Sequence, residues 1–255
     1  MIRKQGDPQG SVEVNLGENS LLYEVDSRLF RGVFNEREET VAAHTGKNQL
    51  YTFAASLFNA DVFISIPKLK THQKVGATLN LKGLVGAITQ KNQLVHWRVG
   101  YPEIGGDEYP NKREYEASKS AKVTHRGAWP GNDTIWRMVA DLYNALRTKD
   151  RRYFTVIDGI MAGEGRGPFC PTAKHVNTLI GSSSFLAADI TAVRYMGYDP
   201  HNIRYLEHFI DNREISLDEI EVLSDKIHGD FFREKTRYLD FAVASRWEEL
   251  KYPLE

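Results

Sequence analysis

Residues 61–72, DVFISIPKLKTH, carry the strongest indication of the fold. The first part is an apolar run closed by a proline, which is typical of a buried strand, often in a parallel sheet. Side chains that can carry positive charge then stand at every second position, at Lys68, Lys70, His72 and Lys74. In an extended chain they share one face, and in a helix each lysine would lie one turn from another of these residues. Crowded cations favour a bound phosphate or carboxylate; the alternative is a solvated basic face balanced by acids of another segment.

Strand and helix patterns alternate on both sides of this stretch. Period-two alternation and apolar runs predict strands at residues 11–17, 20–26, 61–67, 153–160, 176–183 and 217–224. Helical spacing predicts helices at residues 49–60, 75–88, 132–149, 184–200 and 202–213. This order predicts an α/β fold with a mostly parallel or mixed sheet flanked by helices, interrupted by a long irregular segment at residues 89–130. We expect three parts: N-terminal strands in 1–40, an α/β domain in 41–225 and a helical arm in 226–255.

The composition excludes several classes of protein. The chain has 255 residues and a formal net charge of -1, which argues against a general nucleic-acid binder. Its one cysteine, Cys170, excludes an internal disulfide and an iron–sulfur cluster held by this chain alone. No apolar run approaches the roughly 18 residues of a membrane span. These features favour a cytoplasmic protein without a transmembrane segment.

A second polar stretch, VIDGIMAGEGRGP at residues 156–168, also follows a strand pattern. Asp158 ends the apolar run, where carboxylates often orient a metal or a ligand. Glu164 stands among alternating glycines, of which Gly165 and Gly167 can bring backbone N–H groups close to an anion. The spacing is not that of a P-loop, and a tight turn around one buried carboxylate is the alternative. Because α/β sheets bind ligands beyond the carboxyl ends of their strands, we expect this stretch and the lysines to converge.

Three further stretches offer candidate ligands. In residues 91–110, His96, Asp107 and Glu108 could bind Mg²⁺, Mn²⁺ or Zn²⁺, although their spacing matches no standard metal motif and a structural role is more common. The start of the helix at 132–149 places Asn132 and Arg137 toward a ligand or, as we favour, makes a simple cap.

An acid within an apolar helix pattern is a further candidate. Asp189 needs a partner in such surroundings, and a lysine of the basic stretch or a metal would serve.

Taken together, these stretches resemble the DUF362 family. The resemblance is carried by ADVFISIPKLKTHQKVGATLNLKGLVGAI (60–88), by the segments already quoted and by AADITAVRYMGYDP (187–200). The chain is similar to a subgroup of this family that is often encoded among bacterial genes for surface-polysaccharide biosynthesis. Many members carry cysteine-rich ferredoxin segments, which this chain lacks. It also has Lys82-Gly83 where the family reads Lys-Asn. The family's preceding α/β portion is not recognisable before residue 11, so we expect either a shortened member or a fragment, and in a fragment another chain could cover an open sheet edge.

Two functions follow as expectations. The first is an enzyme acting on a phosphorylated or carboxylated small molecule, such as a sugar precursor of surface polysaccharide. In this enzyme the anion would be bound by Lys68, Lys70, Lys74 and Lys82. The general acid or base would be His72 or His96. A metal or a second catalytic carboxylate would be placed at Asp107, Asp158, Glu164 or Asp189. The second is a non-catalytic module that binds an anionic polymer, lipid headgroups or a partner, including a second copy of the chain. A single catalytic site requires Lys70 and Glu164 on one face of the sheet.

Overall fold

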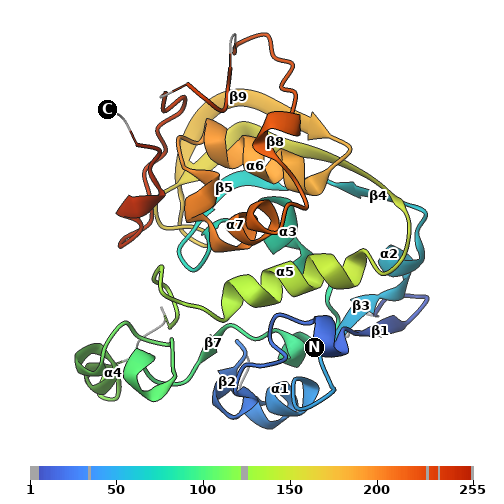
Figure 1. Cartoon of the computed structure of the whole chain (residues 1–255), viewed down its shortest axis with the longest axis vertical. Coiled ribbons are helices and arrows are strands. Elements are labelled where there is room, and N and C mark those ends of the chain that lie inside the picture. The colour runs from blue at the N-terminus through green and yellow to red at the C-terminus, as the bar shows by residue number, and fades with distance from the viewer. Residues whose placement is uncertain (1–5, 34–35, 122–125, 228–229, 235, 254–255) are drawn as a thin grey trace, which may run out of the picture. The chain divides into compact units, whose positions relative to one another are not determined.

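The computed structural model describes most of the chain (Figure 1), namely residues 6–33, 36–121, 126–227, 230–234 and 236–253. The chain divides into two compact units, each assembled from two separate stretches. Unit 1 comprises Met1–Phe63 and Gly83–Arg152, and unit 2 comprises Ile64–Lys82 and Tyr153–Glu255. Among the described residues, no helix is both long and apolar enough to cross a membrane.

Unit 1 combines short strand pairs with helices. Strand β1 (Ser11–Asn15) pairs antiparallel with β3 (Leu50–Ala54), and β2 (Phe30–Arg31) pairs antiparallel with β7 (Trp97–Arg98). The helices are α1 (Arg37–Ala43), α2 (Ala55–Asn59), α4 (Lys112–Ser118) and α5 (Ile135–Leu146). The apolar stripe predicted for the helix at 132–149 is buried along α5, which confirms that helix.

Unit 2 is built on a mixed sheet. Its strands are β4 (Val62–Ser65), which begins in unit 1, β5 (Lys68–His72), β6 (Gly76–Ala77), β8 (Arg152–Glu164) and β9 (Thr172–Ser182). β5 runs parallel to β8, whereas β9 is antiparallel to β8 and β6 is antiparallel to β5. Helices α3 (Leu79–Gly83), α6 (Phe185–Tyr195) and α7 (Arg204–Asp211) complete the unit, and α6 and α7 lie on one side of the sheet (Figure 1). The expected α/β fold with a mixed sheet is therefore confirmed.

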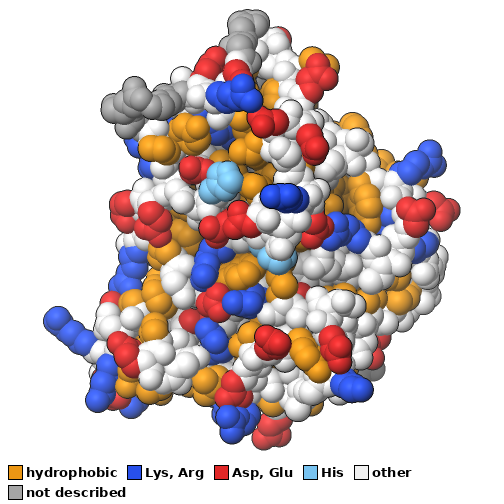
Figure 2. Space-filling view, viewed as in Figure 1, with side chains coloured by type: hydrophobic (Ala, Val, Ile, Leu, Met, Phe, Trp, Pro, Cys, Tyr) orange, Lys and Arg blue, Asp and Glu red, His pale blue; other side chains and the backbone are white. Residues whose placement is uncertain are grey.

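The two faces of this sheet differ in burial. We call the face against α6 the inner face; Leu69 of β5 and Thr155 and Ile157 of β8 are fully buried there. The opposite, outer face carries the alternate residues of the same strands, including Lys68 and Phe154. Figure 2 shows the side of unit 2 on which α6 and α7 lie, where acidic, basic and apolar side chains are intermixed.

The structure corrects several predicted elements. Residues 20–26 form turns instead of a strand, and residues 50–54 of the predicted helix at 49–60 are strand β3. Pairing with β1 overrides the helical spacing there, as tertiary contacts often do for short segments. Residues 217–224 contain a 3₁₀ turn but no strand, and the described part of 226–255 contains no α-helix.

One strand that is confirmed in position has an unexpected environment. Residues 62–65 form strand β4, within the predicted strand. However, Ile64 in this strand and Ile66 just after it are exposed, and Ile66 exposes 72% of its surface. An unbroken apolar run usually marks a strand that is covered on both faces. Here one face of the run lies open.

Candidate functional site

The basic strand and the glycine-rich stretch do converge in unit 2. The parallel register of β5 and β8 places Lys68 opposite Asp158 and Lys70 opposite Gly163. Beyond β8, the loop returns to β5, where the Thr71 hydroxyl donates to the Gly165 carbonyl (2.9 Å). The carboxyl ends of two neighbouring parallel strands therefore meet, which is where α/β folds place ligands.

Two lysines of β5 project from the outer face: Lys68 at the start of the strand and Lys70 at its middle, opposite Gly163 near the carboxyl end of β8. Lys68 donates to the Asp158 carboxylate, and this hydrogen bond holds the pKa of Asp158 below its usual value. Lys70 is half-buried and makes a long contact of 3.4 Å with the Pro168 carbonyl. Gly163 lies beside it, where an added Cβ would come within 2.9 Å of Pro171. The absence of a side chain at Gly163 leaves room for the loop to pack next to Lys70.

Glu164 does not join these lysines. Because Gly163 stands beside Lys70 on the outer face, the next residue projects to the inner face. There the Glu164 carboxylate accepts hydrogen bonds from Lys174 (2.8 Å) and from the backbone N–H of Ala242 (2.9 Å). Lys70 and Glu164 thus lie on opposite faces, and the condition for a single site containing both is not met.

Of the other cationic positions, Lys74 is half-buried like Lys70, whereas His72 and Lys82 are more enclosed. His72 is buried, and its Nδ1 accepts the backbone N–H of Lys74 at 3.0 Å. Lys82 is also buried, in the short helix α3. These residues are therefore less open to a large ligand than Lys68, which is exposed.

The loop glycines shape the turn, and their N–H groups are occupied. Gly165 N–H donates to the Ala242 carbonyl, and Gly167 N–H donates to the Gly165 carbonyl, both at 2.8 Å. An added Cβ at Gly167 would lie 2.0 Å from the Thr71 carbonyl oxygen. The predicted cradle of free N–H groups is therefore wrong for these two glycines: Gly167 packs closely against β5, and Gly165 adopts a φ of +74° that favours glycine.

Asp189 has a different partner from the one that the sequence suggests. Its carboxylate is fully buried and accepts the backbone N–H groups of Asn80 and Leu81, both at 2.9 Å, and the Asn80 side-chain amide at 2.8 Å. Burial raises the pKa of Asp189 to about 7, against the effect of these donors. Both oxygens are used at the first turn of α3, so neither the predicted lysine nor a metal is needed to satisfy them.

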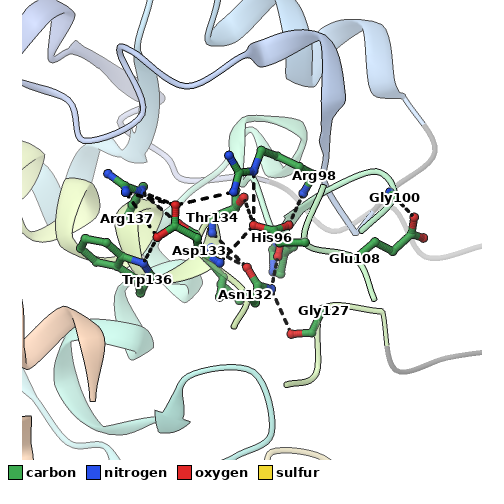
Figure 3. A network of polar contacts seen from close by, with 12 residues as sticks. His96, Arg98, Gly100, Glu108, Gly127, Asn132, Asp133, Thr134, Trp136 and Arg137 are labelled. Carbon is green, nitrogen blue, oxygen red and sulfur yellow. Dashed lines mark hydrogen bonds and ion pairs between the residues drawn. The ribbon is translucent and has the colours of Figure 1, made fainter. Parts of the chain in front are cut away.

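The predicted ligands of unit 1 form a separate polar network (Figure 3). The Asp107 carboxylate accepts from the Thr134 hydroxyl and the Arg98 backbone N–H, both at 2.5 Å, and from the Asp133 backbone N–H at 3.1 Å. The Arg98 side chain lies 3.4 Å from the same carboxylate. Burial raises the pKa of Asp107. Its surroundings are hydrogen-bond donors, which suit a carboxylate that ties the long loop to the start of α5.

Asn132 and Arg137 belong to the same network. Asn132 donates to the carbonyls of His96 and Gly127, both at 2.9 Å, and its own carbonyl accepts from Thr134 and Ile135 at the start of α5. Arg137 pairs with the Asp133 carboxylate at 3.1 Å. The Asn132 carbonyl thus satisfies backbone N–H groups at the start of α5, as the sequence favours, whereas Thr134, the residue directly before the helix, makes no side-chain cap.

His96 and Glu108 complete the predicted set in unit 1. His96 is buried with Nδ1 2.8 Å from the Leu94 carbonyl, and Glu108 pairs with Arg126 at 3.2 Å. Within the described ranges, no group of three or more His, Cys, Asp or Glu side chains is arranged to hold a metal ion.

Sequence reasoning missed two exposed residues of unit 2, one of them next to the proline whose carbonyl Lys70 contacts. Phe169, which is 90% exposed, follows the proline whose carbonyl Lys70 contacts. His175 of β9 is exposed and pairs with Met161 of β8. The only sequence signal was an aromatic residue in the proline-flanked segment PFCP at residues 168–171.

Comparison with known proteins gives two findings and one absence. A thylakoid-associated protein of Synechocystis is 26% identical over 145 residues, which cover 57% of this chain and 35% of that protein. The matched part is thus about a third of that relative's length. No solved structure matches the chain. Residues 11–194 match the family described as a domain of unknown function, DUF362. The chain therefore belongs to the DUF362 family.

Proposed function

We propose that this protein binds an anionic group of a ligand through Lys68 and Lys70 on the outer face of unit 2. The observation that carries the proposal is the register of β5 and β8. It sets both lysines on one face of β5, with Lys70 opposite Gly163, a residue without a side chain near the carboxyl end of β8. Asp158 compensates Lys68, whereas Lys70 has a long contact with a carbonyl oxygen. A phosphate or carboxylate would supply the stronger, charge-assisted partner.

The ligand class follows from this chemistry and from the relatives. The resemblance to proteins of polysaccharide gene clusters suggests a sugar phosphate or another acidic sugar precursor in a cytoplasmic setting. One relative is named for its association with thylakoids. Anionic lipid headgroups are therefore also among the ligands that we propose for the lysines.

Titration calorimetry with inorganic phosphate, citrate and a panel of nucleotide sugars tests the proposal. Lys70→Ala should weaken binding about tenfold or more, because a hydrogen bond to a charged group contributes about 1.5–3 kcal/mol. Lys68→Ala should act in the same direction, and binding should weaken as salt is added. Lys47→Ala, which removes an exposed lysine of unit 1, is the matched control. Equal affinity of the wild-type chain and both unit 2 variants would refute the proposal.

Turnover of the bound molecule is a second candidate. It is favoured by His72, which follows Lys70 by two residues in the same strand and could act as a general acid or base. Glu164 would not take part from the inner face. The test is turnover of the same panel with and without Mg²⁺, Mn²⁺ or Zn²⁺, in wild type and His72→Gln. If wild type shows no turnover under any of these conditions, only the binding function is retained.

A further inference from the structure

The outer face of the unit 2 sheet exposes a group of large apolar side chains. These residues come from β4, β8, β9 and the link between β4 and β5, and they are Ile64, Ile66, Phe154, Ile160, Met161 and Leu179. We call them the apolar outer patch. Soluble proteins seldom leave so many large apolar side chains exposed together without a binding role. Sheets with parallel strands are also normally covered on both faces.

Register and alternation place the patch on one side. Leu179 pairs with Asp158, which pairs in turn with Lys68, so β9, β8 and β5 contribute neighbouring outer residues in one row. Ile66 and Ile64 precede Lys68 at steps of two residues, and Phe154 precedes Asp158 by four. An irregularity in the β8–β9 ladder lies between Gly159 and Met161, where both Ile160 and Met161 are exposed.

Cations continue the same surface toward the strand ends. Lys68 and Lys70 project from the outer face, and the loop that receives the Lys70 contact carries the exposed Phe169. Apolar side chains beside lysines and an exposed aromatic residue are the combination found on proteins that lie at the membrane interface. Asp158 offsets the charge of Lys68, so Lys70, whose contact is a carbonyl oxygen, carries the charge that is complementary to an anionic surface.

We propose that the outer face of unit 2 docks on an anionic lipid surface. The apolar outer patch enters the boundary between headgroups and acyl chains, while Lys68 and Lys70 contact lipid phosphates. The proposal rests on the anion binding proposed above, since the same lysines supply the charge. A second copy of the chain is a weaker occupant, because the carboxylate that it would present from this face, Asp158, already accepts from Lys68.

Sedimentation with vesicles tests the proposal on the full chain. Wild type should sediment with vesicles of phosphatidylcholine and phosphatidylglycerol and stay in solution with phosphatidylcholine alone. Lys68→Ala and Lys70→Ala should each weaken partition about fivefold, in line with the attraction of one lysine to an anionic surface. Ile66→Ser should weaken the partition about tenfold or more. On docking, the isoleucine side chain would be buried in the lipid, and serine lacks most of the transfer free energy of that burial.

Two features of the design keep its outcomes distinct. Ile66 is so exposed that its replacement removes little internal packing, and Leu223→Ser, at another exposed position of unit 2, is the matched apolar control. Ile66→Ser should bind inorganic phosphate as wild type does, whereas the lysine variants should lose affinity for both phosphate and vesicles. Thermal unfolding of each variant verifies that it is folded.

Three results would overturn the inference. The first is wild type that binds phosphate but not anionic vesicles, which leaves the proposed anion site intact. The second is vesicle binding by Ile66→Ser equal to that of wild type. The third is a dimer in light scattering that Ile66→Ser converts to monomer, which would identify the occupant as a second copy. Failure of the anion site itself would instead appear as unchanged phosphate binding in the lysine variants.

Discussion

Replacing Asp189 is the sharpest test of how unit 2 is held together. In Asp189→Ala, the backbone N–H groups of Asn80 and Leu81 and the Asn80 side-chain amide lose their acceptor inside a buried region. A buried donor left without a partner costs about 1–3 kcal/mol. With partial entry of water, we expect a total loss of about 3–5 kcal/mol, a large share of the 5–15 kcal/mol that is typical of a protein.

The isosteric variant Asp189→Asn tests the electrostatic part of this reasoning. The pKa of Asp189 is about 7 in the folded chain, against 3.8 for an unperturbed aspartate. The folded state therefore binds this proton more tightly than the unfolded state. The stability that proton binding at Asp189 contributes is fully present below about pH 4 and is lost as pH rises to about 7. The loss is about 1.4 kcal/mol per pH unit and about 4 kcal/mol in total.

Urea unfolding followed by circular dichroism from pH 4 to pH 8 measures this effect. The free energy of unfolding of wild type minus that of Asp189→Asn should fall with rising pH and level off above about pH 7. Asp211→Asn, which changes an exposed carboxylate on α7, serves as the control. A difference between wild type and Asp189→Asn that stays constant over this range would refute the assignment of the proton to Asp189.

Two other substitutions test close packing and a second buried carboxylate. Gly167→Ala should lower the melting temperature far more than Gly165→Ala. The new Cβ at position 167 would meet the Thr71 carbonyl oxygen at 2.0 Å, whereas a Cβ at position 165 would enter open space and alanine there would only be strained by the φ of +74°. Equal shifts would contradict this account. Tyr51→Phe removes a 3.1 Å hydrogen bond to Asp141, whose pKa burial raises to about 7, and should reduce the free energy of unfolding by about 1–2 kcal/mol in urea at pH 8. No loss of stability at pH 8 would show that this bond contributes little.

Much of the fold could be predicted from local pattern. The spacing of apolar residues located α5 and α6, and the apolar runs located β4 and β8. The alternation of these elements indicated an α/β fold with a mixed sheet. The convergence of the basic strand with the glycine-rich loop also followed, because parallel neighbours end at the same edge.

The partners of the buried acids could not be predicted in this way. Asp189 is bound by donors from α3 that lie more than a hundred positions earlier in the chain. Its place in an apolar helix signalled only that some partner was required. Which partner it finds depends on how α3 and α6 pack, and composition carries no information about that choice.

The order of apolar runs, lysines and glycines was enough to predict that the basic residues and the glycine-rich loop come together, but only the pairing of β5 with β8 sets which acids face the lysines. By simple alternation, Asp158 and Glu164 would share a face, because their numbers differ by six. In the structure, β5 advances by two residues from Lys68 to Lys70 while β8 advances by five from Asp158 to Gly163. An odd advance reverses the facing of every later side chain, so Glu164 turns inward. This irregularity is a property of strand pairing, which no single strand's pattern specifies.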